Sequence, residues 1–457
     1  MQHFDVIIIG GGPGGTAAAK LLANAGRSVA VIEDSHLGGT CLNCGCVPTK
    51  LLLGAVAAKG AIAAQQRLRV AKGTYALDFT ALQKRVKRFV GGSVQTLAKN
   101  LAALGVTVFN GRGEAVGPGR VLVHGTDAEC ELSGTEIILS GGSAPAAFPG
   151  LTPDHDCVLD STDLLNSVTV PESLIVVGAG AIGVELGQFF AAAGSKVTIV
   201  EAAPHVAPLE DADIAAEFRR ALVKAGITCV EGKKAVELVT KDGQASLSLE
   251  DGTVLNASKA MVAVGRRPNT AGLGAEALGC SLDRRGYVVT DAFLAAAEHV
   301  HAIGDINARV LLAHAAEHQA AFVARRILGR IPSGEAYVSG PVPSCYYGGT
   351  EIMRVGETAE ALRRQGRDVA VSVAPLSANV IAQAHGANSG FAKVVWSDGI
   401  IAGIAAVGSD VSHLVTAAQL LMQGGYSDDR LYSVMFAHPT LDEILPLALR
   451  AERVPVK

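Results

Sequence analysis

Two stretches of the chain repeat one pattern of apolar, small and polar positions. Each has an apolar run, a glycine-rich turn, a segment of small residues at helical spacing and a second apolar run that ends in glutamate, and the stretches are Phe4–Glu33 and Ser173–Glu201. The first glycine precedes the glutamate by 23 residues in both copies, 33 − 10 and 201 − 178. Strand, helix and strand in this order form a βαβ unit on a parallel sheet. The repeat therefore predicts two such units.

Other apolar runs predict strands beyond residue 340 and no membrane span. FAKVVW (391–396) and IIAGIAAVG (400–408) are typical of strands. The first apolar run follows Asp5 and lacks a positive leader, so we expect a strand that is retained and not a secretory signal. The longest apolar stretch, Leu174–Gly194, is interrupted by glycines and by Glu185. We expect a cytoplasmic protein without a membrane partner.

Length and composition favour an α/β protein of several domains. The chain has 457 residues, which corresponds to about two to four domains. It is 49% hydrophobic and only 4% aromatic, with 53 glycines, which favours α/β architecture over an all-β sandwich. The formal net charge is −4, so no basic field attracts nucleic acid, and we expect no nucleic-acid partner.

The glycines of both repeats have the spacing G-x-G-x-x-G. The first allows a tight turn, the second lets the backbone approach a pyrophosphate, and the third lets helix and strand pack closely. These positions are Gly10, Gly12 and Gly15 in one copy and Gly178, Gly180 and Gly183 in the other. Glu33 and Glu201 end the second strands, where a carboxylate accepts hydrogen bonds from ribose. Two dinucleotide sites are predicted, and since no arginine follows Glu201 in EAAPHVAP, the second should prefer NAD to NADP.

Three cysteines follow the first repeat in GGTCLNCGCVPTK (38–50). In a long, cysteine-poor chain this spacing indicates a redox or metal site. A regular helix would separate Cys41 from Cys44 by about 4.5 Å along its axis and from Cys46 by about 7.5 Å. Geometry alone therefore leans toward Cys41 with Cys44, whereas Cys41 with Cys46 requires an irregular turn, which Gly45 would supply.

The cysteine cluster has no second set of ligands at zinc-like spacing elsewhere in the chain, so we predict no metal. The other cysteines are scattered singly and are expected to be small buried apolar residues: Cys130, Cys157, Cys229, Cys280 and Cys345. A nicotinamide and a disulfide each exchange two electrons, and a flavin bridges them. The simplest assignment is FAD in the first unit and NAD in the second.

A histidine far along the chain offers a base for thiol chemistry. His438 precedes a proline in AHPTLDE, and because proline suits the first helical position, His438 is expected at the start of a helix with Glu443 close enough to orient it. A thiol needs such a base to become a good nucleophile near neutral pH. Taken alone, the segment favours a histidine that only caps a helix over a catalytic base.

The ordered motifs resemble the flavin-dependent pyridine nucleotide-disulfide oxidoreductases, and among these the dihydrolipoamide dehydrogenases. Besides the two glycine turns and the cysteine segment, the resemblance is carried by VGRRPN (264–269), HAIGD (301–305), LLAHAAEHQA (311–320) and FAHPTLDE (436–443). It implies an α/β fold with two Rossmann-like dinucleotide-binding domains, for FAD and NAD, and a C-terminal α+β dimerisation domain. The implied boundaries are 1–148 and 271–338 for the two parts of the FAD domain, 149–270 for the NAD domain and 339–457 for the interface domain.

The resemblance also implies roles for single residues. Cys41 and Cys46 would form the redox disulfide, with Cys41 facing the substrate and Cys46 the flavin. Lys50 and Glu185 match an ion pair near the flavin, and His438 and Glu443 match the catalytic base and the acid that orients it. In the family this histidine comes from the other subunit of a homodimer. Further cofactor contacts are implied at Gly39, Thr40, Lys50, Gly113, Ser143, Gly265, Asp305 and Ala313.

The implied activity is oxidation of protein-bound dihydrolipoamide to lipoamide with reduction of NAD. The substrate would be a lipoyl-bearing protein, in a 2-oxoacid dehydrogenase or glycine cleavage system. Two alternatives stay open: an NAD(P)H-dependent reductase of another disulfide, and a catalytically silent flavin-binding subunit of a multienzyme assembly. Several departures from the family pattern bear on the substrate. Cys44 is either a packing substitute or a third thiol able to rearrange the disulfide, and YYGGTE (346–351) stands where the family resembles YTDPE.

Overall fold

The computed structural model describes residues 1–125, 129–332, 334–425 and 432–456. The chain divides into two compact units. The first unit comprises residues 1–48, 84–146 and 265–339, and the second comprises residues 49–83, 147–264 and 340–457. Each unit is therefore assembled from segments that are far apart in the sequence.

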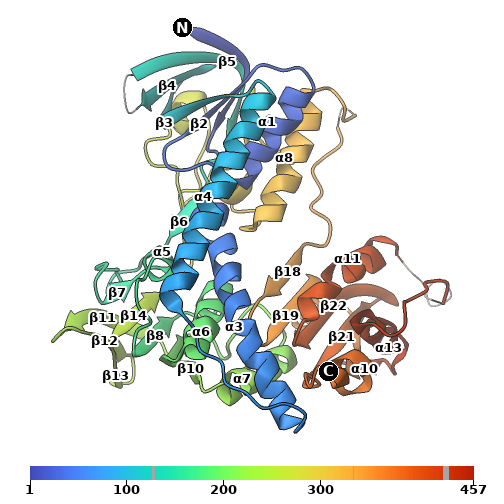
Figure 1. The fold of residues 1–457 in the computed structure, drawn as a ribbon. Helices are drawn as coiled ribbons and strands as arrows, with labels where there is room; N and C mark the ends of the chain where they lie inside the picture. The colour runs from blue at the N-terminus through green and yellow to red at the C-terminus, as the bar shows by residue number, and fades with distance from the viewer. Residues whose placement is uncertain (126–128, 333, 426–431, 457) are drawn as a thin grey trace. The chain divides into compact units, whose positions relative to one another are not determined.

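The first unit is built on a seven-stranded sheet (Figure 1). Five strands run parallel in the order β3-β2-β1-β5-β17, and their bounds are β1 Gln2–Ile9, β2 Val29–Glu33, β3 Thr107–Gly117, β5 Glu129–Leu139 and β17 Val300–Ala302. Strand β4 (Arg120–Gly125) pairs antiparallel with β3 and β5, and β16 (Ala295–Ala297) pairs antiparallel with β17. Helices α1 (Pro13–Asn24) and α8 (Ala313–Ile327) lie side by side (Figure 1).

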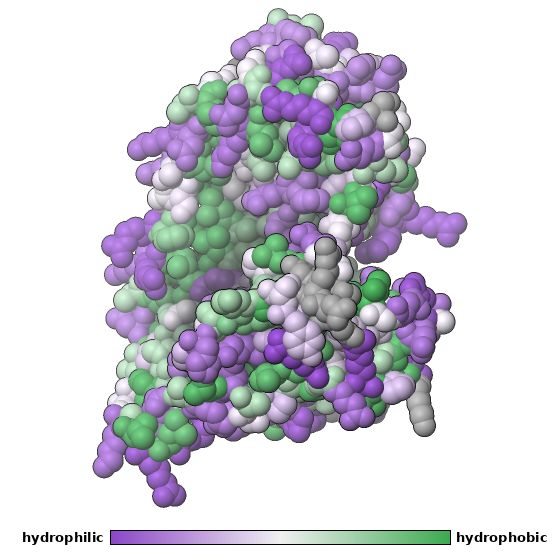
Figure 2. All heavy atoms as spheres, turned by 90° about the vertical axis from the view of Figure 1, so that its right-hand side faces the viewer, coloured by the Kyte–Doolittle hydropathy of each residue, from purple (hydrophilic) through white to green (hydrophobic). Residues whose placement is uncertain are grey.

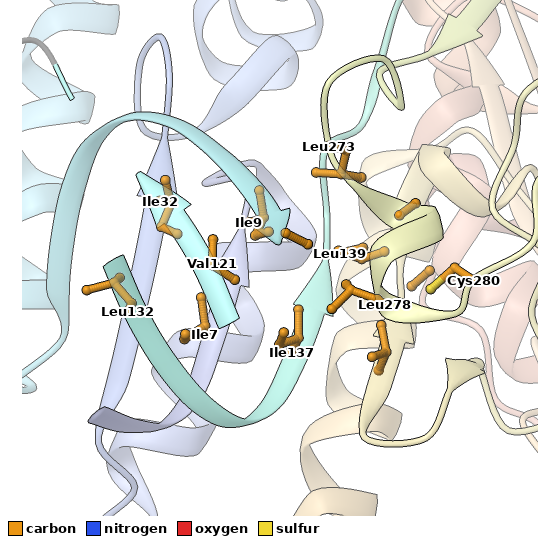
Figure 3. Packing of buried hydrophobic residues seen from close by; sticks show 14 of the residues in the cluster. Ile7, Ile9, Ile32, Val121, Leu132, Ile137, Leu139, Leu273, Leu278 and Cys280 are labelled. Carbon is orange, nitrogen blue, oxygen red and sulfur yellow. The ribbon is translucent and has the colours of Figure 1, made fainter. Parts of the chain in front are cut away.

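The central strand β1 is buried on both faces. Ile7 and Ile9 pack with Ile32 into the core seen in Figure 3, which also holds side chains of β4 and β5. Val6 and Ile8, on the opposite face, pack into a second core beneath α1 and α8. A parallel strand covered on both faces needs apolar residues at consecutive positions. This explains why the first apolar run is continuous and does not alternate.

The second unit contains a parallel sheet of the same plan. Its order is β10-β9-β8-β14-β7, with bounds β7 Val158–Leu159, β8 Ser173–Val177, β9 Lys196–Glu201, β10 Thr228–Glu231 and β14 Lys259–Val262. The helices that follow these strands are α5 (Ser161–Leu165), α6 (Ala181–Ala193) and α7 (Ala212–Lys224). An antiparallel sheet of β11 (Ala235–Lys241), β12 (Gln244–Leu249) and β13 (Val254–Ala257) is inserted before β14. The prediction of two βαβ units is confirmed.

The C-terminal part of the second unit is a six-stranded antiparallel sheet in the order β18-β19-β22-β21-β20-β23. The strands are β18 Pro343–Tyr346, β19 Glu351–Gly356, β20 Val369–Pro375, β21 Gly390–Ser397, β22 Ile400–Gly408 and β23 Val454–Pro455. Helices α9 (Ala359–Arg364), α10 (Val380–Ala384), α11 (Val415–Gln423) and α13 (Ile444–Arg450) accompany it. The two apolar runs predicted as strands fall in β21 and β22. The predicted α/β class with a C-terminal α+β domain is confirmed.

A buried ionic network joins the α7 region to the C-terminal sheet inside the second unit. Lys393 of β21 is 1% exposed, and its ammonium lies 2.7 Å from Asp211 and 2.5 Å from Asp213. Arg354 of β19 pairs with the buried Glu210 at 2.9 Å. Buried charges persist only when they are paired, so these contacts fix the start of α7 against the C-terminal sheet.

One helical stretch has the length and apolar composition of a membrane span. It is Gly39–Arg67, which comprises α2 (Gly39–Cys44) and α3 (Cys46–Arg67), with a mean hydropathy of 1.4 in its most apolar window. The stretch is interrupted at Gly45, and Lys50 within it is ion-paired with Glu185. Figure 2 shows hydrophilic and hydrophobic side chains interspersed over the face in view. Core helices of globular proteins pass the same composition test, so the stretch is weak evidence for a membrane span.

Candidate active site

The first glycine turn joins β1 to α1 and requires glycine at two positions for lack of space. Gly10 has φ +107°, and a Cβ on it would lie 2.2 Å from the carbonyl oxygen of Ser140. A Cβ on Gly15 would lie 2.0 Å from the carbonyl oxygen of Gly10. Gly12, which caps α1 with extended backbone, differs because a Cβ there would meet nothing within 4 Å. The turn therefore packs tightly on the protein side and is open at Gly12.

The second glycine turn, between β8 and α6, repeats this geometry. Gly178 has φ +105°, and its Cβ would lie 2.4 Å from the carbonyl oxygen of Ala263. A Cβ on Gly183 would lie 2.0 Å from the carbonyl oxygen of Gly178, and one on Gly180 would again meet nothing within 4 Å. Helix N-termini present unpaired N–H groups and a positive dipole to anions. The open glycines at the starts of α1 and α6 therefore fit a dinucleotide pyrophosphate in each unit.

The glutamates that end β2 and β9 make equivalent contacts in the two units. Glu33 accepts the Gly11 N–H at 2.7 Å and the Ser35 N–H at 3.0 Å. Glu201 accepts the Ala179 N–H at 2.7 Å and the Ala203 N–H at 2.8 Å. Burial raises the pKa of Glu33, and the N–H donors oppose that rise. Each carboxylate thus closes its glycine turn from the end of the second strand.

The cysteine segment folds as two helices separated by Gly45. Cys41 and Cys44 lie in α2 and are half-buried, whereas Cys46 is exposed and begins α3. A Cβ on Gly45 would lie 2.8 Å from the carbonyl oxygen of Thr40, so the chain folds back closely there. The irregular turn that a pairing of Cys41 with Cys46 requires is therefore present. The sequence left both pairings open, and the break at Gly45 favours the second.

Helix α2 begins against the first glycine turn. A Cβ on Gly39 would lie 2.8 Å from the Cα of Gly12, and the Gly38 N–H donates to the Gly11 carbonyl at 2.8 Å. The Asn43 amide donates to the Leu37 and Gly39 carbonyls, which connects α2 to the residues just before it. Sequence reasoning missed Asn43, although it lies inside the quoted motif. Cys41 therefore lies two residues after Gly39, whose backbone contacts the glycine turn at Gly12.

A short hydrogen-bond relay holds Asp305, in the 3-10 helix Gly304–Asn307. Ser143 is 3% exposed; its Oγ donates to Asp305 at 2.5 Å and accepts from Arg266 Nε at 2.7 Å. Arg266 Nε lies 3.7 Å from the Asp305 carboxylate. Strands β6 (Ser143–Pro145) and β15 (Arg266–Pro268), which pair antiparallel, bring serine and arginine together. Arg266 lies in the quoted VGRRPN motif but was not predicted as a site residue.

Other predicted cofactor contacts occupy three different settings. Gly265 has φ +132° with open space beside it, and Ala313 is the first residue of α8. Gly113 is buried on β3, where a Cβ would lie 3.0 Å from Ile9. Thr40 is exposed in α2. Gly265 therefore has space beside its backbone, whereas a side chain at Gly113 would compress the sheet core.

Lys50 and Glu185 form an ion pair within the second unit. The Lys50 ammonium donates to Glu185 Oε2 at 2.7 Å, and the Glu185 side chain, in the middle of α6, is 7% exposed. Burial raises the pKa of Glu185, and the Lys50 charge opposes that rise. Sequence reasoning expected this pair. It did not expect Tyr347, which donates its N–H to Glu185 Oε1 at 3.2 Å and places its ring 4.4 Å from the Lys50 ammonium.

The His438 ring meets Glu443 in the second unit. Its Nδ1 lies 2.9 Å from Glu443 Oε1, and Glu443 Oε2 accepts the Thr440 N–H at 3.1 Å. The hydrogen bond from His438 lowers the pKa of Glu443. The expectation that Pro439 occupies the first helical position was wrong. Thr440 caps the following 3-10 helix Leu441–Glu443, because its capping box with Glu443 satisfies the exposed N–H groups, and Pro439 precedes that cap.

The expectation that the scattered cysteines are buried holds for two of the five, whereas Cys130, Cys229 and Cys345 are only half-buried. Cys157 and Cys280 are buried in two of the cores, and Cys130 packs against one of them. Burial raises the pKa of Cys229 and of Cys345 to about 11. A thiol with a raised pKa is a poor nucleophile at neutral pH.

Family models cover nearly all of the chain. Residues 4–320 match the model described as pyridine nucleotide-disulphide oxidoreductase, and residues 342–449 match the dimerisation domain of the same family. A dihydrolipoyl dehydrogenase from Chlorobaculum tepidum is 36% identical over 449 residues, which cover 96% of this chain and 95% of the relative. Dihydrolipoyl dehydrogenase 3 from Pseudomonas putida is 35% identical, with 97% of each chain covered.

Solved structures give the same picture. LpdA from Mycobacterium tuberculosis superposes with a TM-score of 0.89 at 25% identity, covering 98% of this chain and 99% of that one. The HOCl-induced flavoprotein disulfide reductase RclA from Escherichia coli has a TM-score of 0.85 at 29% identity, covering 97% of this chain and 99% of that one.

Proposed function

The chain belongs to the pyridine nucleotide-disulphide oxidoreductase family, and from this premise we propose that it oxidises protein-bound dihydrolipoamide to lipoamide and reduces NAD. The observation that carries the proposal is the docking of the cysteine helix α2 on the open glycine turn of the first unit. That contact supports a thiol next to a dinucleotide site in the first unit, and the matching glycine turn supports a second dinucleotide site in the same chain. The full-length dihydrolipoyl dehydrogenase relatives support the choice of substrate.

The residues present fit FAD in the first unit and NAD in the second. Gly12 and Gly180 leave the backbone open to a pyrophosphate, and Glu33 and Glu201 stand at the ribose positions. Bound FAD would supply a two-electron acceptor that exchanges hydride with the nicotinamide. The predicted domains, 1–148 with 271–338 for FAD, 149–270 for NAD and 339–457 for the interface, form part of this proposal.

The chain's own residues account for the thiol chemistry. His438 would accept a proton from the dithiol substrate, and Glu443, held 2.9 Å from its ring, would stabilise the imidazolium. The substrate thiolate attacks the Cys41 sulfur of a Cys41–Cys46 disulfide, the S–S bond breaks, and Cys46 leaves as a thiolate. The second substrate thiol then displaces Cys41, which releases lipoyl disulfide. The two electrons of the substrate now reside in the reduced cysteine pair.

The proposed active form is a homodimer. A match to a dimerisation domain over residues 342–449 supports the pairing of two chains, and the resemblance assigns His438 to the partner's active site. The proposed partner is a lipoyl-bearing protein of a 2-oxoacid dehydrogenase or glycine cleavage system, and the proposed location is the cytoplasm.

Reduction of another disulfide is the second candidate. Cys44, a half-buried third thiol in α2, and the likeness to a flavoprotein disulfide reductase favour it. The two candidates differ in the direction of electron flow and in the substrate that reacts with Cys41.

A spectrum and a substrate comparison test the proposal. Anaerobic NADH should produce a long-wavelength thiolate-to-flavin band, and dihydrolipoamide with NAD should turn over faster than NADH or NADPH with glutathione disulfide. Cys46→Ser should abolish both results, whereas the matched Cys44→Ser variant should keep them. Absence of the band would indicate a silent flavin-binding subunit, and faster turnover with glutathione disulfide would favour the second candidate.

A further inference from the structure

Tyr347 contacts both members of the Lys50–Glu185 pair, which the sequence did not predict. Glu185 uses both carboxylate oxygens. Oε2 accepts from the Lys50 ammonium at 2.7 Å, and Oε1 accepts from the backbone N–H of Tyr347 at 3.2 Å. The ring of the same tyrosine stands 4.4 Å from the Lys50 ammonium, measured to its centroid. The ammonium is thus held between a carboxylate and an aromatic face.

The segment that carries Tyr347 is anchored on α6. Gln188, one helical turn after Glu185, donates to the Tyr347 carbonyl at 3.3 Å and accepts the Thr350 N–H at 3.1 Å. Gly348 has φ +153°, and a Cβ there would lie 2.3 Å from the Gln188 amide. The glycine therefore lets the segment approach the helix closely. This YYGGTE segment (346–351) is one of the departures from the family pattern named above.

Tyr347 contacts the Lys50 ammonium as a neutral side chain. The Tyr347 ring is half-buried, and burial raises the pKa of its hydroxyl, which also contacts the Cys345 thiol. Burial likewise raises the pKa of Cys345 to about 11. Both groups are neutral near pH 7, so only Glu185 and the aromatic face attract Lys50 among these neighbours. A cation over an aromatic face is attracted by the negative face of the ring, and the attraction strengthens where water is excluded.

We propose that Tyr347 is a positioning residue for Lys50: its ring and its backbone N–H together set where the Lys50–Glu185 pair presents its positive charge. The consequence for the flavin rests on the proposed function, since the family resemblance places this pair near the flavin. A cation held beside the flavin favours the reduced flavin, which carries more negative charge. Loss of the ring should therefore make the flavin harder to reduce.

The first experiment measures Lys50 itself and needs no flavin chemistry. Purified wild-type protein, Tyr347→Phe and Tyr347→Leu are labelled with trace acetic anhydride, and acetylation at each lysine is quantified by peptide mass spectrometry. Lys59, in the same helix α3 with its ammonium 2.7 Å from the Ala192 carbonyl, is the internal control. We expect Tyr347→Leu to raise Lys50 labelling by about two- to fivefold, with Lys59 unchanged and Tyr347→Phe at the wild-type rate. Unchanged Lys50 labelling, or an equal rise at Lys59 that indicates local unfolding, would overturn the proposal.

The second experiment measures the flavin in the holoenzyme. The reduction potential, determined against a reference dye, should fall in Tyr347→Leu and not in Tyr347→Phe. The double variant Lys50→Met with Glu185→Gln removes the ion pair and leaves neither partner as an unpaired buried charge. In this double variant, Tyr347→Leu should not change the reduction potential. An equal fall in that double variant would mean that the tyrosine does not act through Lys50. Because neither experiment uses dihydrolipoamide, failure to oxidise that substrate would refute the proposed function and leave this inference standing.

Discussion

Replacing the open glycine of the second turn should weaken NAD binding without unfolding the protein. Gly180 has φ −70° and ψ 179°, which alanine adopts, and its Cβ would meet nothing within 4 Å. The stability cost of Gly180→Ala is therefore only that of a poorer helix cap, about 1 kcal/mol or less. The methyl group would project into the space through which a pyrophosphate approaches the N–H groups of α6.

The expected loss of affinity follows from the hydrogen bonds at stake. A hydrogen bond to a charged group contributes about 1.5–3 kcal/mol, so loss of one or two phosphate contacts weakens NADH binding by about tenfold or more. The assay is a titration of NADH by fluorescence, together with the FAD content of the purified protein. FAD content should stay at the wild-type level in Gly180→Ala, because Gly12 is intact. Gly12→Ala should show the reverse pattern.

Gly183→Ala is the matched control in the same helix. Its Cβ would lie 2.0 Å from the Gly178 carbonyl oxygen, so the backbone has to move by about 1 Å, and overpacking of this kind costs about 1–3 kcal/mol. We expect a lower melting temperature for Gly183→Ala and a nearly unchanged one for Gly180→Ala. Wild-type NADH affinity in Gly180→Ala would refute the assignment of the open glycine to the pyrophosphate. Equal melting temperatures for the two variants would contradict the packing argument for Gly183.

Two further predictions concern stability. Lys393→Met leaves the buried Asp211 carboxylate without its ammonium partner, so we expect a loss of about 3–5 kcal/mol in denaturant unfolding, whereas Lys224→Met at the exposed end of α7 should be nearly neutral. His124 lies 2.8 Å from each of two glutamates, whose hydrogen bonds raise its pKa. The stability from these contacts is present below about pH 6.5 and is lost as the pH rises through the raised pKa. The melting temperature of His124→Gln should therefore fall further below wild type at pH 6 than at pH 9, and the opposite trend would contradict this.

The parts of the site that the sequence predicted depend on short chain separations. The glycine turns span six residues, and Glu443 follows His438 by five, so spacing and local sterics suffice to bring these groups together. Even there, the proline position was misjudged, because a threonine cap with its capping box competed for the helix start. The disulfide pairing could not be chosen by helix geometry, because the helix is interrupted at Gly45.

By itself the sequence determined the two βαβ units, two strands of the C-terminal sheet and the identity of the thiol and base candidates, because hydrophobic period and glycine spacing act within one element or between neighbours. Tertiary structure alone decided that Arg266 supports Asp305 through Ser143 and that Tyr347 encloses Lys50 against Glu185. Ser143 and Asp305 are 162 residues apart in the chain, as are Glu185 and Tyr347. Contacts at such separations depend on how whole sheets pack, and no local pattern in the sequence records that packing.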